Sequence, residues 1–199
     1  MLARLIGSGG IACSFFRPVL VSLDQESVIV VRRERLRINL GRANGQREIA
    51  FADFPAAYMA PAIEPNELVT AVRFPRWSPN HSYAFIEFSR RHGDFAITSA
   101  AVLLEGDAWG KITRASVTIG GMGTAPKRAR EVEQAIVGQV PAGTLFRDAC
   151  ESCRKLEAID DVHAPASYRQ HLAAVLSRRA LEKAHARLTG TDQNRAWPH

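Results

Sequence analysis

Three consecutive apolar runs with tight connections, at residues 83–89, 96–104 and 111–119, constrain the fold of this chain more than any other feature. The first run is rich in aromatic residues, the second is almost continuously apolar, and the third alternates between apolar and polar residues. Short connections favour antiparallel pairing, because parallel strands need a crossover of a dozen or more residues. The pattern therefore predicts a three-stranded antiparallel sheet.

Three helical patterns follow the predicted sheet. The first has Pro126 in its opening turn, where a missing N–H is tolerated, and it stops at Gly138. The second begins near Thr144, and the third begins at Ser167 with Gln170 three residues later, the spacing of a capping box. The apolar residues that share a helix face are Ala129, Val132, Ala135 and Ile136, then Leu145, Ala149, Cys153 and Leu156, then Leu172, Leu176, Ala180, Ala184 and Leu188. Helices that follow a small antiparallel sheet cover one of its faces, so the pattern predicts an α+β domain.

The residues before the predicted sheet indicate short strands. Residues 28–31 are β-branched, and residues 35–40 alternate with a period of two. Asn44-Gly45 is a common hairpin turn, and a turn-rich stretch with two prolines at 74–80 interrupts any strand. The predicted organisation is a first domain at residues 1–75, a second domain at 76–190 and a disordered tail at 191–199.

Composition and charge exclude several classes of protein. The 199 residues are 46% apolar and 23% charged, which is ordinary for a globular chain that buries a core. The net charge of +6 comes from scattered Lys and Arg that cluster only at residues 32–37, so no nucleic-acid binding is predicted. No apolar run reaches the roughly 20 residues of a membrane span, and an odd cysteine count favours a reducing compartment. We therefore expect a cytoplasmic protein without a membrane span.

Reactive residues elsewhere give no clear site. Cys150 and Cys153 have the spacing of a redox pair, but they fall inside a predicted helix without a second pair or a nearby histidine. Two buried helix cysteines are the favoured interpretation. The six histidines show no metal-ligand spacing, and no Ser-His-Asp set or pair of carboxylates is apparent. We predict no metal site and no catalytic residue.

Two segments combine residue types suited to a ligand. In SRRHGDFAI, residues 89–97, basic residues lead through a Gly-Asp step into an apolar run. On the residues alone, this is a corner between strands in which Asp94 caps backbone amides while Arg90 and Arg91 are solvated. In IGSGGIA, residues 6–12, glycines would let backbone amides approach a pyrophosphate, or they form a flexible start of the chain. Both alternatives stay open at this level.

Four segments stand in the order and at the spacings of one known family. They are Asp53-Phe54 with LVTAVRFP at 68–75; YAF at 83–85 with SRRHGDFAI at 89–97; Ile119, Gly120, Gly121, Pro126, Arg128, Ala129, Glu133 and Gly138; and Ser167, Tyr168 and Arg169 with Arg178, Arg179, Ala180, Leu181 and Ala184. Lys127 departs from the pattern by standing between the proline and the arginine. From about Pro18 onward, the chain resembles the flavin-binding medium subunit of molybdenum hydroxylases, the family of aerobic carbon monoxide dehydrogenases and xanthine dehydrogenase-type enzymes.

The resemblance implies a role in electron transfer. In that family the medium subunit carries FAD. Electrons leave the substrate at a molybdopterin cofactor on the large subunit, pass the 2Fe–2S clusters of the small subunit and reach the flavin, which hands them to a quinone, oxygen or NAD. Binding of FAD requires amides for the pyrophosphate, an apolar wall for the ring and polar groups at the edge of the ring.

The resemblance also implies which residues meet the cofactor. Phe95 forms the wall of the flavin ring, and Arg91 and Asp94 reach its polar edge or fix the turn. Residues 13–17, CSFFR, depart from the family's His-Ala-Asp-Pro-type stretch and remove an expected polar contact. The residues implied at the pyrophosphate are Gly7, Ser8, Gly9 and Gly10.

The first of the family's two glycine turns has no counterpart in this chain. The chain therefore resembles a remnant of a flavin-binding domain followed by the α+β domain, and a truncated paralogue, a fragment and one piece of a split flavoprotein are all open explanations. The first two imply that tight FAD binding is lost through truncation. The predicted function is an FAD-binding electron-transfer subunit of a molybdopterin-dependent hydroxylase or dehydrogenase. The alternative is a non-catalytic remnant or assembly module of that family that binds no FAD.

Overall fold

The computed structural model describes residues 20–22, 28–30, 37–42, 45–50, 53–57, 60–73, 77–91 and 94–191. The chain divides into two compact units, Met1–Arg76 and Trp77–His199. The glycine-rich segment at residues 7–10 and the end of the predicted tail, residues 192–199, lie outside the described residues. Within the described part of the chain, no helix is both long and apolar enough to cross a membrane.

The first unit contains short antiparallel strands. Strands β3 (Arg37–Arg42), β4 (Gly45–Ala50) and β7 (Leu68–Arg73) form a three-stranded sheet in the order β4-β3-β7. Two further pairs are β1 (Leu20–Ser22) with β2 (Val28–Val30), and β5 (Pro55–Ala57) with β6 (Ala60–Pro61). The alternation predicted around β3 is confirmed, because Ile38 and Leu40 point into a small core that also contains Phe54.

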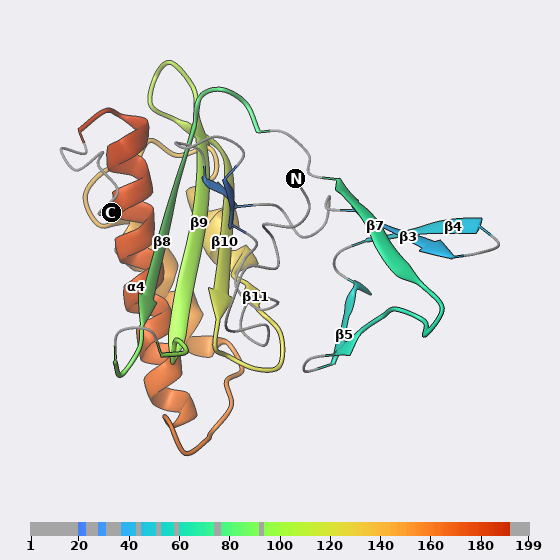
Figure 1. Ribbon diagram of the computed structural model, residues 1–199. Helices are drawn as coiled ribbons and strands as arrows, with labels where there is room; N and C mark the ends of the chain where they lie inside the picture. Colours follow the sequence, from blue (N-terminus) through green and yellow to red (C-terminus); the bar gives the residue numbers. More distant parts are fainter. Residues whose placement is uncertain are drawn as a thin grey trace. The chain divides into compact units, whose positions relative to one another are not determined.

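The second unit is built on one antiparallel sheet in the order β11-β10-β9-β8 (Figure 1). Its strands are β8 (His81–Phe88), β9 (Thr98–Gly106), β10 (Ile112–Gly120) and β11 (Lys127–Arg128). The three long strands confirm the predicted meander. The prediction of three strands is nevertheless one strand short, because the backbone of Lys127 and Arg128 pairs with the end of β10.

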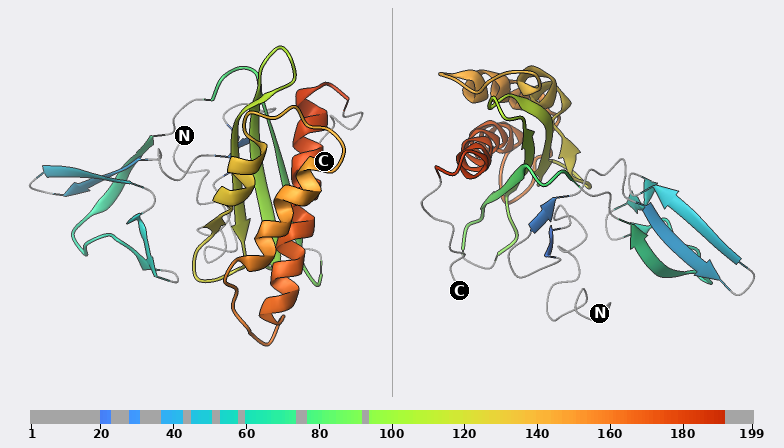
Figure 2. Two further views of the ribbon diagram at one scale, coloured as in Figure 1. Left: turned by 180° about the vertical axis from the view of Figure 1, so that it is seen from behind. Right: turned by 90° about the horizontal axis from the view of Figure 1, so that it is seen from above.

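Helices cover one face of this sheet. They are α2 (Arg130–Ile136), α3 (Leu145–Cys150), the 3-10 helix η3 (Glu151–Lys155) and α4 (Ala166–Leu188). The view from behind and the view from above in Figure 2 both place the helices on the same side of the strands. Leu172, Leu176 and Ala180 of α4 are buried in one core with Val102 and Leu104 of β9. Each large apolar side chain buried there contributes about 1.5–3 kcal/mol, so the helix layer is fixed to the sheet.

The start of α2 differs from the prediction. Pro126 precedes β11, and the helix begins only at Arg130, because the intervening residues pair with the sheet. Val132 is buried as expected, whereas Ala135 is exposed. Gly138 follows the helix with a φ of +87°, a left-handed conformation, so the predicted C-terminal stop is confirmed.

The predicted capping box of α4 is wrong. The helix begins at Ala166, and no side chain of its N-cap residue makes a capping hydrogen bond. The Ala166 N–H instead donates to Asp160 Oδ1 at 2.7 Å. The Gln170 side chain, expected to complete the box with Ser167, donates to the carbonyl oxygen of Leu156 at 2.8 Å.

Candidate functional site

The segment SRRHGDFAI forms the connection between β8 and β9. The Ile97 N–H donates to the Phe88 carbonyl oxygen at 2.8 Å, and the Asp94 N–H donates to the Arg91 carbonyl oxygen at 3.1 Å. The Ser89 hydroxyl donates to that same Arg91 oxygen at 2.9 Å. These bonds make a corner between two strands; residues 92–93 within it lie outside the described residues.

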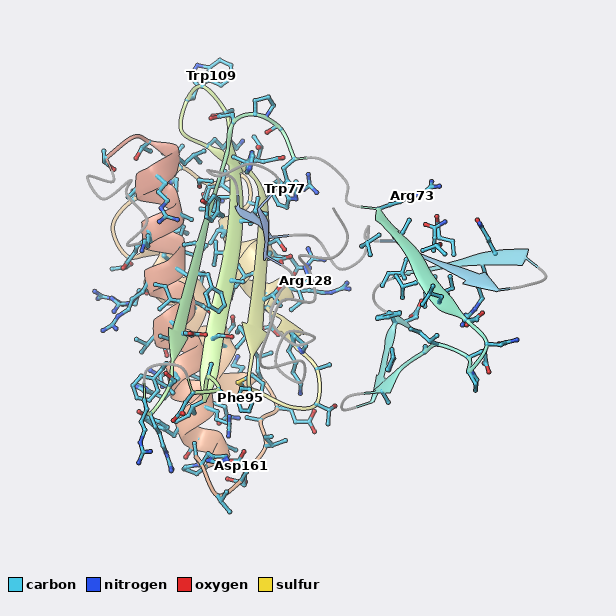
Figure 3. All side chains as sticks on the ribbon, in the orientation of Figure 1. Arg73, Trp77, Phe95, Trp109, Arg128 and Asp161 are labelled. Atoms are coloured by element: carbon cyan, nitrogen blue, oxygen red, sulfur yellow. The ribbon has the colours of Figure 1, made fainter. Side chains whose placement is uncertain are left out.

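Phe95 projects from this corner with 63% of its surface exposed. Figure 3 shows it at the opposite end of the sheet from Trp109. Arg91 and Asp94 are exposed as well, and the carboxylate of Asp94 accepts no hydrogen bond from the described backbone, so the capping role considered for it is not found there. The three side chains implied at the flavin ring are therefore all accessible at one corner.

Arg169, in the first turn of α4, fixes this corner from the helix side. The residue is 4% exposed. Its Nη1 donates to the carbonyl oxygens of Ile97 at 2.5 Å and Gly121 at 2.8 Å, and its Nη2 donates to Asp161 Oδ2 at 2.6 Å. One guanidinium thus joins the β8–β9 connection, the loop after β10 and the loop before α4. Arg169 belongs to the family pattern, which implies no role for it. The sequence signal for a buried role is that this cation shares a helix face with the buried residues Leu172 and Leu176.

Asp161 supplies the counter-charge to Arg169. Its Oδ1 accepts hydrogen bonds from the amides of His163 at 2.9 Å and Ala164 at 3.0 Å. Burial raises the pKa of this carboxyl, but the hydrogen bonds from Arg169 and from the two amides outweigh burial and lower the pKa from 3.8 to about 2. The ion pair is therefore fully charged at neutral pH.

Gly121 lets the loop after β10 approach the corner. Its φ is +81°, and a Cβ built there would lie 2.2 Å from the Ile97 carbonyl oxygen. Only glycine combines this backbone conformation with so close an approach. The close approach of Gly121 is therefore to the same carbonyl that Arg169 binds.

The cysteine pair and a small pocket are the other candidates for a site. Cys150 and Cys153 are buried, as predicted, and their mutual hydrogen bond together with burial raises the pKa of the Cys150 thiol. A pocket of about 220 Å³ lies between α3 and α4, lined in part by Phe146 and His185. It is smaller than the roughly 300–1,000 Å³ of sites for drug-sized ligands. No three His, Cys, Asp or Glu side chains of the described residues gather in a way that could hold a metal ion.

The chain matches a known protein family. A family model described as the CO dehydrogenase flavoprotein C-terminal domain matches residues 83–184, which include the Phe95 corner, Gly121 and Arg169. The carbon monoxide dehydrogenase medium chain of Afipia carboxidovorans is 35% identical over 144 residues, covering 72% of this chain and 50% of that protein. The 6-hydroxypseudooxynicotine dehydrogenase complex subunit alpha of Paenarthrobacter nicotinovorans is 31% identical over 151 residues, covering 75% of this chain and 51% of that protein.

A solved structure agrees with these matches. The reconstituted CO dehydrogenase from Oligotropha carboxidovorans superimposes with a TM-score of 0.70 at 33% identity, covering 78% of this chain and 54% of that one. The chain thus spans about half the length of the relatives it matches.

Proposed function

The chain belongs to the family of CO dehydrogenase flavoprotein C-terminal domains, and from this membership we propose that it is an FAD-binding electron-transfer subunit of a molybdopterin-dependent hydroxylase or dehydrogenase. Its relatives include the medium chain of a carbon monoxide dehydrogenase and a subunit of a dehydrogenase complex. The proposed partners are a molybdopterin-binding large subunit and a 2Fe–2S small subunit. The proposed location is the cytoplasm.

The exposure of Phe95 is the observation that carries this proposal. The side chain is 63% exposed although the residues that follow it enter the core, and it lies inside the segment matched by the family model. An accessible aromatic ring on a strand corner suits the apolar wall that a flavin ring needs. The described residues therefore fit the ring portion of FAD. Contact of Gly7, Ser8, Gly9 and Gly10 with the pyrophosphate stays a prediction.

Bound FAD would supply a two-electron acceptor. Phe95 would cover one face of its ring and keep water away from it. Arg91, which is exposed in the same connection, would offer a positive charge to the polar edge of the ring. A cation there favours negative charge on the ring, so it would ease reduction. Asp94 would oppose that effect, and the balance between the two side chains would tune the electron affinity.

A titration of the purified full chain with FAD tests the proposal. We expect quenching of flavin fluorescence that saturates. We expect Phe95→Ala to raise the dissociation constant for FAD about tenfold, which is the loss of affinity expected when a good aromatic contact is removed. Trp109→Ala is the matched control, because Trp109 is also an exposed aromatic residue on a turn of the same sheet. We expect it to leave FAD affinity unchanged.

The same titration separates the alternative function. A folded chain that takes up no added FAD would contradict electron transfer and would support an assembly module of this family. Equal weakening by Phe95→Ala and Trp109→Ala would show that flavin uptake does not involve the corner between β8 and β9.

A further inference from the structure

The geometry points to Arg169 as the positioning residue that holds Phe95 in place for its ligand; this inference rests on the proposed function. Phe95 is exposed, yet its backbone is anchored on both sides. Before Phe95, the Asp94 N–H donates to the Arg91 carbonyl oxygen. After it, the Ile97 N–H donates to the Phe88 carbonyl oxygen. The carbonyl of the same Ile97 is held by Arg169 at 2.5 Å.

Two contacts define the position of the Ile97 carbonyl. Arg169 donates a hydrogen bond to its oxygen, and a Cβ at Gly121 would lie 2.2 Å from that same oxygen, so only glycine fits there. A shift of this carbonyl away from Arg169 would leave a buried guanidinium short of a partner, and that is unfavourable in a site only 4% exposed. The corner therefore has one well-defined backbone position.

The planar shape of the guanidinium group of Arg169 makes this anchoring possible. Its planar fork reaches two carbonyl oxygens with Nη1 and the carboxylate of Asp161 with Nη2. A lysine at position 169 would keep the charge, but its single ammonium group does not reproduce the fork. An exposed aromatic side chain on an anchored backbone loses little conformational freedom on binding, which increases affinity.

The test measures amide hydrogen exchange and FAD binding in the full chain. In Arg169→Gln we expect the Ile97 amide to exchange about tenfold faster, while the Trp109 amide at the other end of the sheet stays unchanged. Arg179→Gln is the matched control, because Arg179 is an exposed arginine on the same helix. Arg169→Lys should be intermediate. Gly121→Ala, which places a methyl group against the Ile97 carbonyl, provides a second way to displace it if Arg169→Gln fails to fold.

A double-mutant cycle distinguishes positioning from general stabilisation. We expect Arg169→Gln to weaken FAD binding about fivefold to tenfold in the presence of Phe95 and to have almost no effect in a Phe95→Leu background. Equal weakening in both backgrounds would overturn the inference, as would unchanged exchange at Ile97 or full recovery by lysine. If the unaltered chain takes up no FAD, the proposed function and the ligand part of the inference both fail, whereas the exchange data alone decide whether Arg169 anchors the corner.

Discussion

The two connections that flank β9 each expose an aromatic side chain, but they are held by different means. Phe95 lies between β8 and β9 and is 63% exposed; Trp109 lies between β9 and β10 and is 83% exposed. The Trp109 turn is held by its own residues, since Asp107 Oδ1 accepts hydrogen bonds from the amides of Trp109 and Lys111, both at 2.9 Å. The Phe95 corner is held by Arg169, 72 residues away from the carbonyl that it binds.

This difference separates a turn held by local hydrogen bonds from a corner that adds contacts across the fold to its local ones. The Trp109 turn needs no helix to be in place, because its bonds span at most four residues. Within the Phe95 corner, Arg90 Nη2 also donates a hydrogen bond to the His163 carbonyl oxygen, which lies 73 residues away in the sequence. A surface that depends on tertiary contacts is uniquely positioned only in the folded protein, as a binding site requires.

Replacement of Arg169 should produce the largest effect. In Arg169→Leu, two carbonyl oxygens lose their donor and Asp161 loses its counter-charge, so we expect a loss of about 2–4 kcal/mol in the free energy of unfolding. Urea unfolding followed by far-UV circular dichroism measures this loss, because the described helices all lie in the second unit. Arg179→Leu should change stability by less than about 0.5 kcal/mol. Similar losses in both variants would remove the distinction between the two connections.

A pair of glycines with the same backbone conformation sharpens the comparison. Gly121 near the Phe95 corner has a φ of +81°, and Gly110 in the Trp109 turn has a φ of +79°. Replacement of either glycine by alanine should lower the free energy of unfolding by about 1 kcal/mol, the ordinary cost of a left-handed conformation at a residue with a Cβ. Gly121→Ala adds a contact of 2.2 Å with the Ile97 oxygen, whereas a Cβ at Gly110 meets nothing within 4 Å.

We therefore expect Gly121→Ala to destabilise the second unit by about 1–2 kcal/mol more than Gly110→Ala does. The same urea experiment compares them. An equal loss would mean that the loop after β10 moves away from the corner without penalty, and the anchoring of Ile97 would then depend on Arg169 alone.

Local pattern explains what could be predicted of this fold. The three long strands and the helices follow from periodicity within short windows, and Gly138 follows from its place after a helical run. The two-residue strand β11 could not be predicted, since its pairing with β10 depends on a neighbouring backbone and not on its own side chains. The same pairing explains why α2 begins at Arg130 and not near Pro126.

The residues of the candidate site likewise include some that the sequence could predict and one that it could not. The family pattern directed attention to Arg91, Asp94 and Phe95, and the structure brings these three side chains to one exposed corner. The family pattern could not reveal that Arg169 holds the corner, because the acceptors are the backbone carbonyls of Ile97 and Gly121. Every residue type has such a carbonyl, so its use as an acceptor leaves no trace in the sequence.

A smaller effect should follow from changes in the Trp109 turn. Asp107→Ala removes the acceptor of two amide hydrogen bonds in an exposed loop, and we expect a loss of about 0.5–1 kcal/mol. Asp107→Asn keeps an acceptor oxygen and should retain most of the stability. Exchange of the Trp109 amide should rise only in the alanine variant, while exchange of the Ile97 amide stays unchanged. Faster exchange at Ile97 would show that the two connections are coupled through β9.

Acid should weaken the Phe95 corner only at low pH, and this is the smallest expected effect. The pKa of Asp161 is lowered from 3.8 to about 2 in the folded chain. Between these values the unfolded chain binds more protons, so the stabilisation by this carboxylate is complete above pH 3.8 and is lost as the pH falls through about 2. The gain is modest, because the side chain is 32% exposed and solvent screens the pair.

Asp161→Asn tests this dependence. The difference in urea midpoint between the unaltered chain and the variant should be constant from pH 8 to about pH 5 and should shrink toward pH 2, because protonation removes the same negative charge that the substitution removes. Exchange of the Ile97 amide, compared between the unaltered chain and the variant at each pH, locates the effect at the corner. A midpoint difference that persists unchanged at the lowest pH would mean that hydrogen-bond geometry at Asp161, and not its charge, supports Arg169.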